Sequence, residues 1–148
     1  MQTPQIAVDL AKQFEGLYLK PYICPAGFPT VGYGHLIQSL EHPAITKEEA
    51  EALLSSDMQT ATNGAVRMCP VLLLEPTGRL AALADFCFNL GVGRLQASTL
   101  RRRINQGNWD EAIYELKRWV NGGGRKLQGL VLRREAEAQI ILRAKKCQ

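Results

Sequence analysis

Apolar residues recur at helical spacing in the first part of this chain. Ile6, Leu10 and Phe14 lie four residues apart with alanines beside them, which predicts a helix over residues 3–14 with one buried stripe. Glu15 follows directly and precedes a glycine, so the helix is expected to end there. Its carboxyl group would then lie at the edge of the fold, partly out of water, rather than in open solvent.

Three further segments show the same helical pattern. The first begins with a capping box, Thr46 followed three residues later by Glu49, and runs to about Arg67. Its buried side is expected to hold Ala50, Leu53, Leu54, Met58 and Ala61. An apolar helix is expected over residues 77–90, and an amphipathic one over residues 130–146. The buried side of this last helix is expected to hold Leu132, Ala136, Ile140 and Ile141.

The segment between the first two helices has a different character. Residues 17–37 are rich in glycine, proline and aromatic side chains, which disfavour helix and favour turns and short strands. A small antiparallel sheet with a turn near residues 24–29 is therefore expected. The sequence Gly32-Tyr33-Gly34-His35 follows, where alternate glycines allow a ligand or another part of the backbone to approach closely.

Length and composition fit one globular domain. The chain has 148 residues, of which 46% are hydrophobic and 22% charged, and it can bury a sizeable core. No apolar run approaches the roughly eighteen residues that span a bilayer. Residues 1–5 lack the basic start and the apolar centre of a signal peptide. The sequence therefore predicts synthesis in a cytosol and no stable membrane insertion.

Charge is divided unevenly along the chain. Residues 1–60 hold three Lys/Arg and seven Asp/Glu, a net −4, whereas residues 61–148 hold fifteen and seven, a net +8. A positive half suits an anionic polymer, and peptidoglycan, lipopolysaccharide and nucleic acid all meet that description. Three consecutive arginines begin at Arg101, but consecutive positions diverge around a helix axis and do not form one recognition face. Nucleic acid is therefore not the expected partner.

The four cysteines lack the spacing of a metal site, so neither a metal nor another cofactor is expected. Cys87 lies in an apolar run and is expected to be buried. Cys69 and Cys147 could pair if the last helix returns beside the middle of the chain, although a cytosolic origin argues against a disulfide. Cys24, in the glycine-rich segment, is the cysteine with a candidate chemical role.

The spacing of three polar residues, Glu15, Cys24 and Thr30, indicates a catalytic role for them. Eight residues separate the glutamate from the cysteine and five separate the cysteine from the threonine, shortly before Gly32-Tyr33-Gly34-His35. This arrangement resembles the catalytic signature of the phage-type lysozymes, the muramidase endolysins of glycoside hydrolase family 24. The commoner residue at the second position of that signature is Asp, where this chain has Cys. Further similar blocks extend the likeness to about residues 7–142.

The resemblance implies a mainly helical α+β fold with two lobes, built as a single lysozyme-like domain over residues 1–148. A small antiparallel sheet would belong to the N-terminal lobe, about residues 15–57, and the helix over about residues 46–67 would link the lobes. The helical C-terminal lobe would cover about residues 68–148, with helix 3–14 packed on it.

The resemblance also implies an endolysin that hydrolyses the β-1,4 bond between N-acetylmuramic acid and N-acetylglucosamine in peptidoglycan and so lyses the host cell. Glu15 would protonate the leaving oxygen, and Thr30 would position the attacking water. Cys24 would stand in for the second carboxylate, either as a thiolate base, giving inversion, or as a nucleophile, giving retention. A free thiol has a pKa of about 8.5, so Cys24 needs a lowered pKa or the enzyme an alkaline optimum.

Four residues match family positions that contact the saccharide, namely Phe88, Asn89, Thr99 and Arg125. The alternative role for Thr99 is to cap the next helix, and Arg125 is expected to orient Glu15. His35 and Asp57 are expected to form a structural ion pair, with a catalytic histidine as the alternative.

Two alternative functions remain open on the sequence. If Cys24 is a spectator, Glu15 alone suits a lytic transglycosylase, in which the muramic 6-hydroxyl replaces water and leaves 1,6-anhydro ends. The second is a peptidoglycan-binding module that kept the cleft and lost turnover. In every case the expected partner is the glycan strand. The expected protein is a monomer that is made in the host bacterial cytoplasm, acts on the periplasmic cell wall and depends on a separate holin for release.

Overall fold

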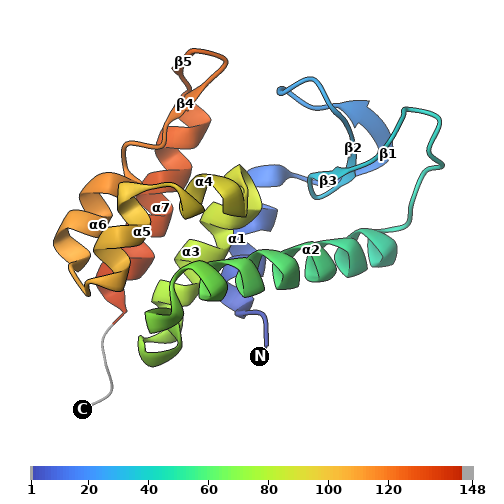
Figure 1. The fold of residues 1–148 in the computed structure, drawn as a ribbon. Helices are drawn as coiled ribbons and strands as arrows, with labels where there is room; N and C mark the ends of the chain where they lie inside the picture. Colours follow the sequence, from blue (N-terminus) through green and yellow to red (C-terminus); the bar gives the residue numbers. More distant parts are fainter. Residues whose placement is uncertain (1, 145–148) are drawn as a thin grey trace.

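One long helix, α2 (Lys47–Met68), runs along the base of the molecule, with a small sheet above one end and a group of helices above the other (Figure 1). The computed structural model describes residues 2–144. This arrangement confirms the predicted α+β class, mainly helical with a small antiparallel sheet in the N-terminal part and a long helix linking the two parts. Among the helices described, none combines the length and the apolar character needed to cross a membrane.

The first helix, α1 (Gln5–Glu15), ends at Glu15 as predicted, and Gly16 leaves it with a φ of +70°. Its buried face differs slightly from the prediction, because Ile6 is 42% exposed. The buried residues are Ala7, Leu10 and Ala11. Two of these three side chains are methyl groups, which lets α1 lie close to its neighbour α3 (Thr77–Leu90).

The capping box predicted at the start of α2 is confirmed. Thr46 Oγ1 accepts a hydrogen bond from the Glu49 N–H at 3.1 Å, and Glu49 Oε1 accepts one from the Thr46 N–H at 3.1 Å. The helix keeps the predicted buried side, with Leu53 half-buried. The buried residues of that set are Ala50, Leu54, Met58 and Ala61.

The predicted sheet consists of β1 (Tyr18–Ile23), β2 (Pro29–Gly32) and β3 (His35–Leu36), all antiparallel and in that order. Tyr22 lies opposite Thr30 in the first pair of strands, and Thr30 lies opposite Leu36 in the second. The middle strand is therefore the one that packs inward, since three of its four residues are buried.

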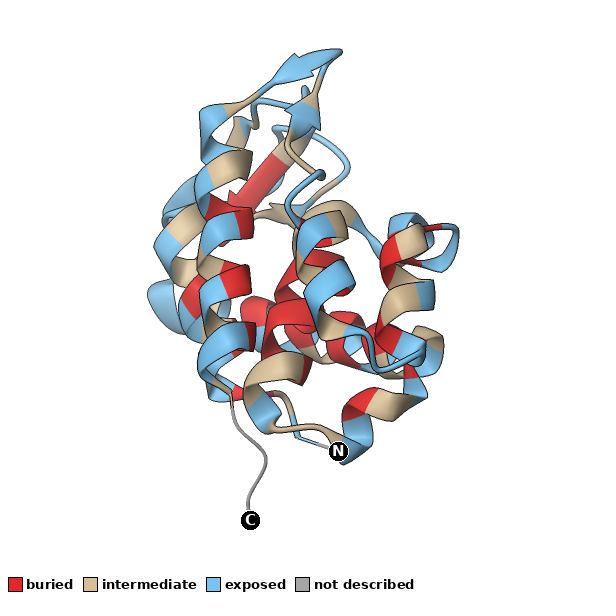
Figure 2. Ribbon diagram, turned by 90° about the vertical axis from the view of Figure 1, so that its left-hand side faces the viewer, coloured by how far each residue is buried: buried red, intermediate tan, exposed pale blue. Residues whose placement is uncertain are grey.

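The helix α3 forms the centre of the helical part. Every residue from Leu80 to Cys87 is buried, which confirms the predicted apolar helix, and α1, α2 and α7 (Gln128–Arg143) pack around it. Figure 2 shows the buried residues concentrated in the middle of this part of the molecule. The smaller elements are η1 (Pro70–Leu74), α4 (Val92–Gln96), α5 (Thr99–Asn105), α6 (Trp109–Leu116), β4 (Asn121–Gly122) and β5 (Arg125–Lys126).

The last helix, α7, buries different residues from those predicted. Leu132 was expected inside but is 53% exposed, whereas Arg133, Arg134 and Glu137 are 0–3% exposed. An apolar pattern assigns leucine to the core, but charged side chains can be buried when they pair with one another, as these do. The expected end of the helix at residue 146 and Cys147, the suggested partner of Cys69, lie outside the described residues.

Candidate active site

A cleft of about 330 Å³ lies between the sheet and the end of α1, and it brings the three predicted catalytic side chains together. Glu15 is the last residue of α1, Cys24 lies in the turn after β1, and Thr30 lies in β2. The remaining lining residues are Phe14, Tyr18, Tyr22, Pro25, Gly34 and Leu36. Helix, turn and strand thus place one polar group each on a shared surface.

Two contacts fix the carboxyl group of Glu15, which is 22% exposed. On one side, Arg133 Nη1 of α7 donates a hydrogen bond to Glu15 Oε2. On the other side lies Gly34, whose φ is +79°. A Cβ atom at position 34 would lie 2.7 Å from Glu15 Oε1, so the carboxyl group occupies space that only glycine leaves open.

Arg133 is itself held from several directions. Its Nε and Nη2 donate to the two carboxylate oxygens of Asp85 at 2.9 and 2.8 Å. Its guanidinium lies 5.5 Å from the ring centre of Phe14 and 5.9 Å from that of Phe88. Burial lowers the pKa of Arg133, but the hydrogen bonds and charges of Asp85 and Glu15 outweigh it and raise the pKa above its ordinary value. Arg133 therefore stays a cation beside Glu15.

The turn that carries Cys24 is suited to a negatively charged sulfur atom. The Cys24 N–H donates to the Phe28 carbonyl at 3.0 Å, and the Gly27 N–H donates to the Cys24 carbonyl at 2.8 Å, which closes the turn. Partial burial raises the pKa of the Cys24 thiol. The neighbouring Phe28 N–H, the Thr30 hydroxyl and the N–H groups of Ala26 and Gly27 favour the thiolate, and together they outweigh that effect and lower the pKa overall.

An aromatic pair lines the same cleft. The rings of Tyr18 and Tyr22 stack with their centres 4.0 Å apart and their planes at 23°. Burial raises the pKa of Tyr22, and the charges of Tyr18, Glu15 and Cys24 add to the rise. The Tyr22 hydroxyl thus stays neutral and lies within electrostatic range of both the acid and the thiol.

The residues predicted to form an ion pair and those predicted to contact the saccharide lie in different parts of the structure. His35 Nδ1 is 2.8 Å from Asp57 Oδ2, so the structure joins these two side chains and ties β3 to α2. Phe88 and Asn89, near the end of α3, are half-buried and are not among the residues that line the cleft. Phe88 faces Arg133, and Asn89 Oδ1 accepts a hydrogen bond from Arg134 Nη2 at 2.8 Å.

Thr99 is the first residue of α5 and does not cap it. The N-cap is Ser98, whose Oγ accepts from the Arg101 N–H at 3.0 Å, so the alternative role expected for Thr99 is wrong. Thr99 Oγ1 instead accepts from Arg102 Nη2 at 3.0 Å. Contact between Thr99 and a saccharide stays a prediction.

Arg125 is not the arginine that orients Glu15, so that expectation is corrected. It is exposed in the β4–β5 hairpin, which rises from the helical part of the molecule (Figure 1), and the guanidinium bonded to Glu15 belongs to Arg133. Sequence reasoning missed Arg133 because the apolar pattern of the last helix gives charged positions to solvent. The available signal was the pair Arg133-Arg134 followed by Glu137 within a helix expected to be half-buried.

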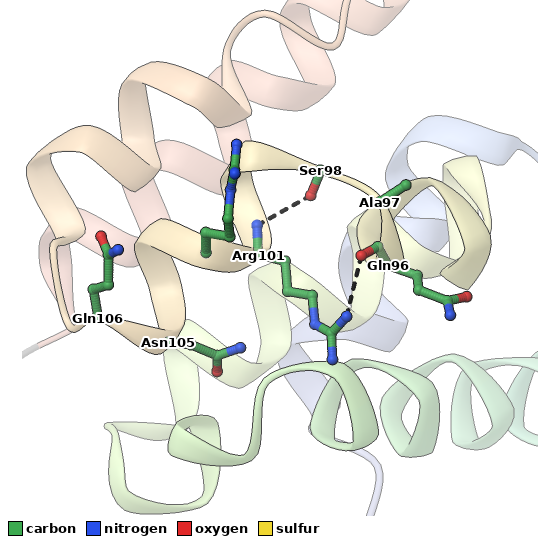
Figure 3. A pocket seen from close by; sticks show the side chains of 7 residues that line it. Gln96, Ala97, Ser98, Arg101, Asn105 and Gln106 are labelled. Carbon is green, nitrogen blue, oxygen red and sulfur yellow. Dashed lines mark hydrogen bonds between the residues drawn. The ribbon is translucent and has the colours of Figure 1, made fainter.

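A second hollow, of about 460 Å³, lies beside α5 in the helical part (Figure 3). Arg101 extends along it, with Nε donating to the Met68 carbonyl at 2.8 Å and Nη1 donating to the Gln96 carbonyl at 3.1 Å. Arg102 turns instead toward Thr99. Neighbouring arginines therefore point to different partners, as the helical spacing predicted.

This chain is similar to known proteins over most of its length. A family model described as phage lysozyme matches residues 12–137. The endolysin of Bacillus phage B103 is 36% identical over 146 residues, which cover 96% of this chain and 54% of the relative. The SAR-endolysin of Bacteriophage PS119 is 37% identical over 130 residues, which cover 86% of this chain and 76% of the relative. The muramidase domain of SpmX from Asticaccaulis excentricus has a TM-score of 0.81 and 30% identity, covering 95% of this chain and 97% of that one.

This chain spans about half the length of the Bacillus phage endolysins that it matches, and most of the length of the other two proteins. The family match begins within α1, ahead of Glu15, and ends within α7 at Glu137. It thus contains the cleft, its three polar side chains and the arginine behind Glu15. The chain belongs to the phage lysozyme family.

Proposed function

We propose that this chain hydrolyses the β-1,4 bond between N-acetylmuramic acid and N-acetylglucosamine in peptidoglycan. The observation that carries the proposal is the cleft that holds a fixed carboxyl group, Glu15, together with an anion-stabilising turn around Cys24. A glycosidase needs one group that protonates the leaving oxygen and another that acts on the opposite side of the sugar. The similarity to phage endolysins and to a muramidase domain supports the same reaction.

Glu15 is the proposed proton donor. Arg133 and Gly34 hold its carboxyl group from two sides, which matters because a misplacement of about 1 Å can cost about 100-fold in rate. Arg133 also places a positive charge beside the carboxylate that remains after the proton has left. The same guanidinium therefore fixes the acid and stabilises its product.

Cys24 is proposed to act as a thiolate, with Thr30 beside it. The lowered pKa of the Cys24 thiol increases the thiolate fraction near neutral pH. The Thr30 hydroxyl donates to the Phe28 carbonyl at 2.8 Å and also lies within hydrogen-bonding reach of Cys24 Sγ. A hydroxyl has one hydrogen and two lone pairs, so Thr30 can turn its hydrogen to the thiolate and still accept from a water molecule.

The thiolate has two possible roles, and they give different products. As a base it would activate the water that Thr30 holds and invert the anomeric centre. As a nucleophile it would form a thioglycosyl intermediate and retain the configuration. Proton NMR of the anomer released in the first minutes of the reaction distinguishes inversion from retention.

The glycan strand is proposed to continue beyond the cleft. Phe88, Asn89, Thr99 and Arg125 are the proposed saccharide contacts. Arg125 would act through its exposed position in the β4–β5 hairpin, which rises from the helical part on the same side of α2 as the sheet (Figure 1). The stacked pair of Tyr18 and Tyr22 offers an aromatic surface within the cleft itself.

The proposed setting is the bacterial cell wall. In this proposal the chain is a monomer, is made in the host cytoplasm, needs no cofactor or nucleic acid, and reaches the periplasmic wall after a separate holin opens the membrane. Expression in a Gram-negative host with and without a holin tests the release route, because lysis should require both proteins. Size-exclusion chromatography with light scattering tests the monomer.

The decisive experiment is digestion of purified peptidoglycan followed by mass spectrometry. Hydrolysis leaves reducing muramic ends, whereas a lytic transglycosylase leaves 1,6-anhydro ends and a binding module leaves the polymer intact. We expect reducing ends from the unchanged chain and no release from Glu15→Gln. The matched control is Glu41→Gln, because Glu41 is an exposed glutamate of the same part of the chain. Intact polymer with the unchanged chain would refute the proposal.

A further inference from the structure

A buried ion pair adjoins the carboxyl group of Glu15. Arg133 Nε and Nη2 donate to Asp85 Oδ2 and Oδ1 at 2.9 and 2.8 Å, and Arg133 Nη1 donates to Glu15 Oε2. Asp85 is 0% exposed and Arg133 is 3% exposed. Glu15 lines the cleft, whereas Asp85 does not. One guanidinium thus bridges a buried carboxylate and the proposed acid.

An unbalanced arginine would work against that acid. A positive charge beside a carboxyl group favours its ionised form. Glu15, however, must keep its proton until the leaving oxygen takes it. The charge of Arg133 therefore has to be balanced by another group if Glu15 is to act as the proton donor.

The contacts of Asp85 suit it to balance that charge. It accepts two parallel hydrogen bonds from Arg133 out of water, which is the strong arrangement for an arginine and a carboxylate. Glu15 accepts only one, at a position that is 22% exposed. Burial raises the pKa of Asp85, but three groups of α7 lower it overall, namely Glu137, Arg133 and Arg134. Asp85 is therefore the anion that Arg133 faces.

The neighbouring arginine has an anion of its own. Arg134 Nε and Nη2 donate to the two carboxylate oxygens of Glu137 at 2.6 and 2.8 Å, and both residues are 0% exposed. The pairs Arg133–Asp85 and Arg134–Glu137 thus account for two positive and two negative buried charges. A protonated Glu15 adds no charge, so the whole set is neutral.

We propose that Asp85 is the counter-ion of Arg133 and that it thereby leaves Glu15 able to hold the proton that the reaction transfers. Asp85 is then a positioning residue for this proton, because it touches neither the cleft nor the reacting atoms. Arginine only donates, so Oε2 is the accepting oxygen and the proton belongs on Oε1, beside Gly34 of the cleft. This inference deepens the function proposed above, and only its rate measurement rests on that function.

The first test follows the protonation of Glu15 directly by NMR. The glutamate side-chain carboxyl groups are labelled with carbon-13, and the signal that is missing from Glu15→Gln identifies Glu15. Asp85→Asn keeps an oxygen that accepts from Arg133 but removes the negative charge, so the pH at which Glu15 is half protonated should fall by about one unit or more. An equal or higher midpoint in Asp85→Asn would overturn the proposal.

The other ionisable groups near Glu15 stay the same in this comparison. They are Tyr18, Tyr22 and Cys24, which line the cleft with it. The matched control is Asp110→Asn, the same chemical change at an exposed position of α6. It should leave the midpoint of Glu15 where it is in the unchanged chain.

The second test asks whether Asp85 acts through the charge of Arg133. The double variant Asp85→Asn with Arg133→Gln removes both charges of the pair and leaves two amides that can hydrogen-bond. Because the pair was neutral before, the midpoint of Glu15 should lie within about half a unit of that in the unchanged chain. A larger difference in either direction would overturn the proposal. The double variant leaves no charge of the pair unbalanced, so it decides the matter even if Asp85→Asn does not fold.

The third test is the initial rate of muropeptide release, measured across the two midpoints found by NMR. Above both midpoints, Asp85→Asn should be slower by up to about tenfold for each unit of midpoint shift, and the loss should shrink as the pH is lowered through them. A loss that is the same at every pH would mean that Asp85 only holds Arg133 in place, which would overturn the proposal. If the unchanged chain releases nothing, the proposed function fails, and the NMR titrations still decide whether Asp85 controls the proton of Glu15.

Discussion

Replacing Gly34 with alanine should push the proposed acid out of position. The new Cβ would lie 2.7 Å from Glu15 Oε1 and 3.2 Å from Glu15 Cδ, so the carboxyl group must move by about 0.7 Å to restore ordinary contact. It cannot do so freely, since Oε2 is bonded to the buried Arg133. A displacement of about 1 Å can cost about 100-fold, so we expect kcat to fall by about 10- to 100-fold.

The same substitution also strains the backbone, and a control must separate the two effects. An L-residue in the left-handed region costs about 1–2 kcal/mol, and Gly34 has a φ of +79°. Gly107 has a φ of +72° and lies between α5 and α6, where a Cβ would meet nothing within 4 Å. Gly107→Ala should therefore lose a similar free energy of unfolding and keep its kcat.

The assay is the initial rate of muropeptide release at saturating peptidoglycan, measured well below the unfolding temperature of either variant. Urea unfolding provides the free energies of unfolding for comparison. If Gly34→Ala keeps the rate of Gly107→Ala while both are folded, close packing of Gly34 against Glu15 does not control the acid.

The surroundings of the cysteines and the packing of the helices lead to four further predictions. Cys24→Asp should stay active, because the N–H groups of the turn suit either anion, with its acidic limb of activity at lower pH. Cys24→Ser should lose most activity, and full turnover by it would remove any chemical role for the thiol. Iodoacetamide at pH 7 should label Cys24 before Cys87, whose pKa burial raises to about 12; equal labelling on peptide mapping would contradict this. Gly64→Ala should cost about 1–3 kcal/mol in urea unfolding, because its Cβ would lie 2.3 Å from Val92 Cγ2. Gly93→Ala, in a helix with open space around the new Cβ, should be at least as stable as the unchanged chain.

Local chemistry in the sequence was sufficient for most of the secondary structure. The capping box of Thr46 and Glu49, the apolar helix over residues 77–90 and the glycine-rich strands all depend on neighbours within a few positions. The same is true of the spacing of Glu15, Cys24 and Thr30, whose resemblance to a known signature indicates the family without reference to any tertiary contact. Interactions between residues that are close in the sequence can therefore be predicted from the sequence alone.

The local sequence pattern does not identify a contact between two residues that lie far apart in the chain. The arginine that holds Glu15 is 118 positions from it, and nothing in the spacing of either residue specifies the other. Arg125 was the expected partner because a glycine-rich loop carries it, but that loop forms an exposed hairpin. The burial of Arg133 was missed for a related reason, since a hydrophobic pattern assigns charge to solvent.

By itself, the sequence determined the four main helices, the N-terminal sheet and the three polar residues of the cleft, because each of these depends on neighbours within a short stretch. Resemblance to a known signature indicated the family. Only the tertiary structure decided which side chain holds the carboxyl group of Glu15. Packing of α7 on α3 brings Arg133 between Asp85 and Glu15 and brings Arg134 against Asn89. Charges can be buried there because the fold pairs them across distant segments, and such pairing has no periodicity for a sequence to display.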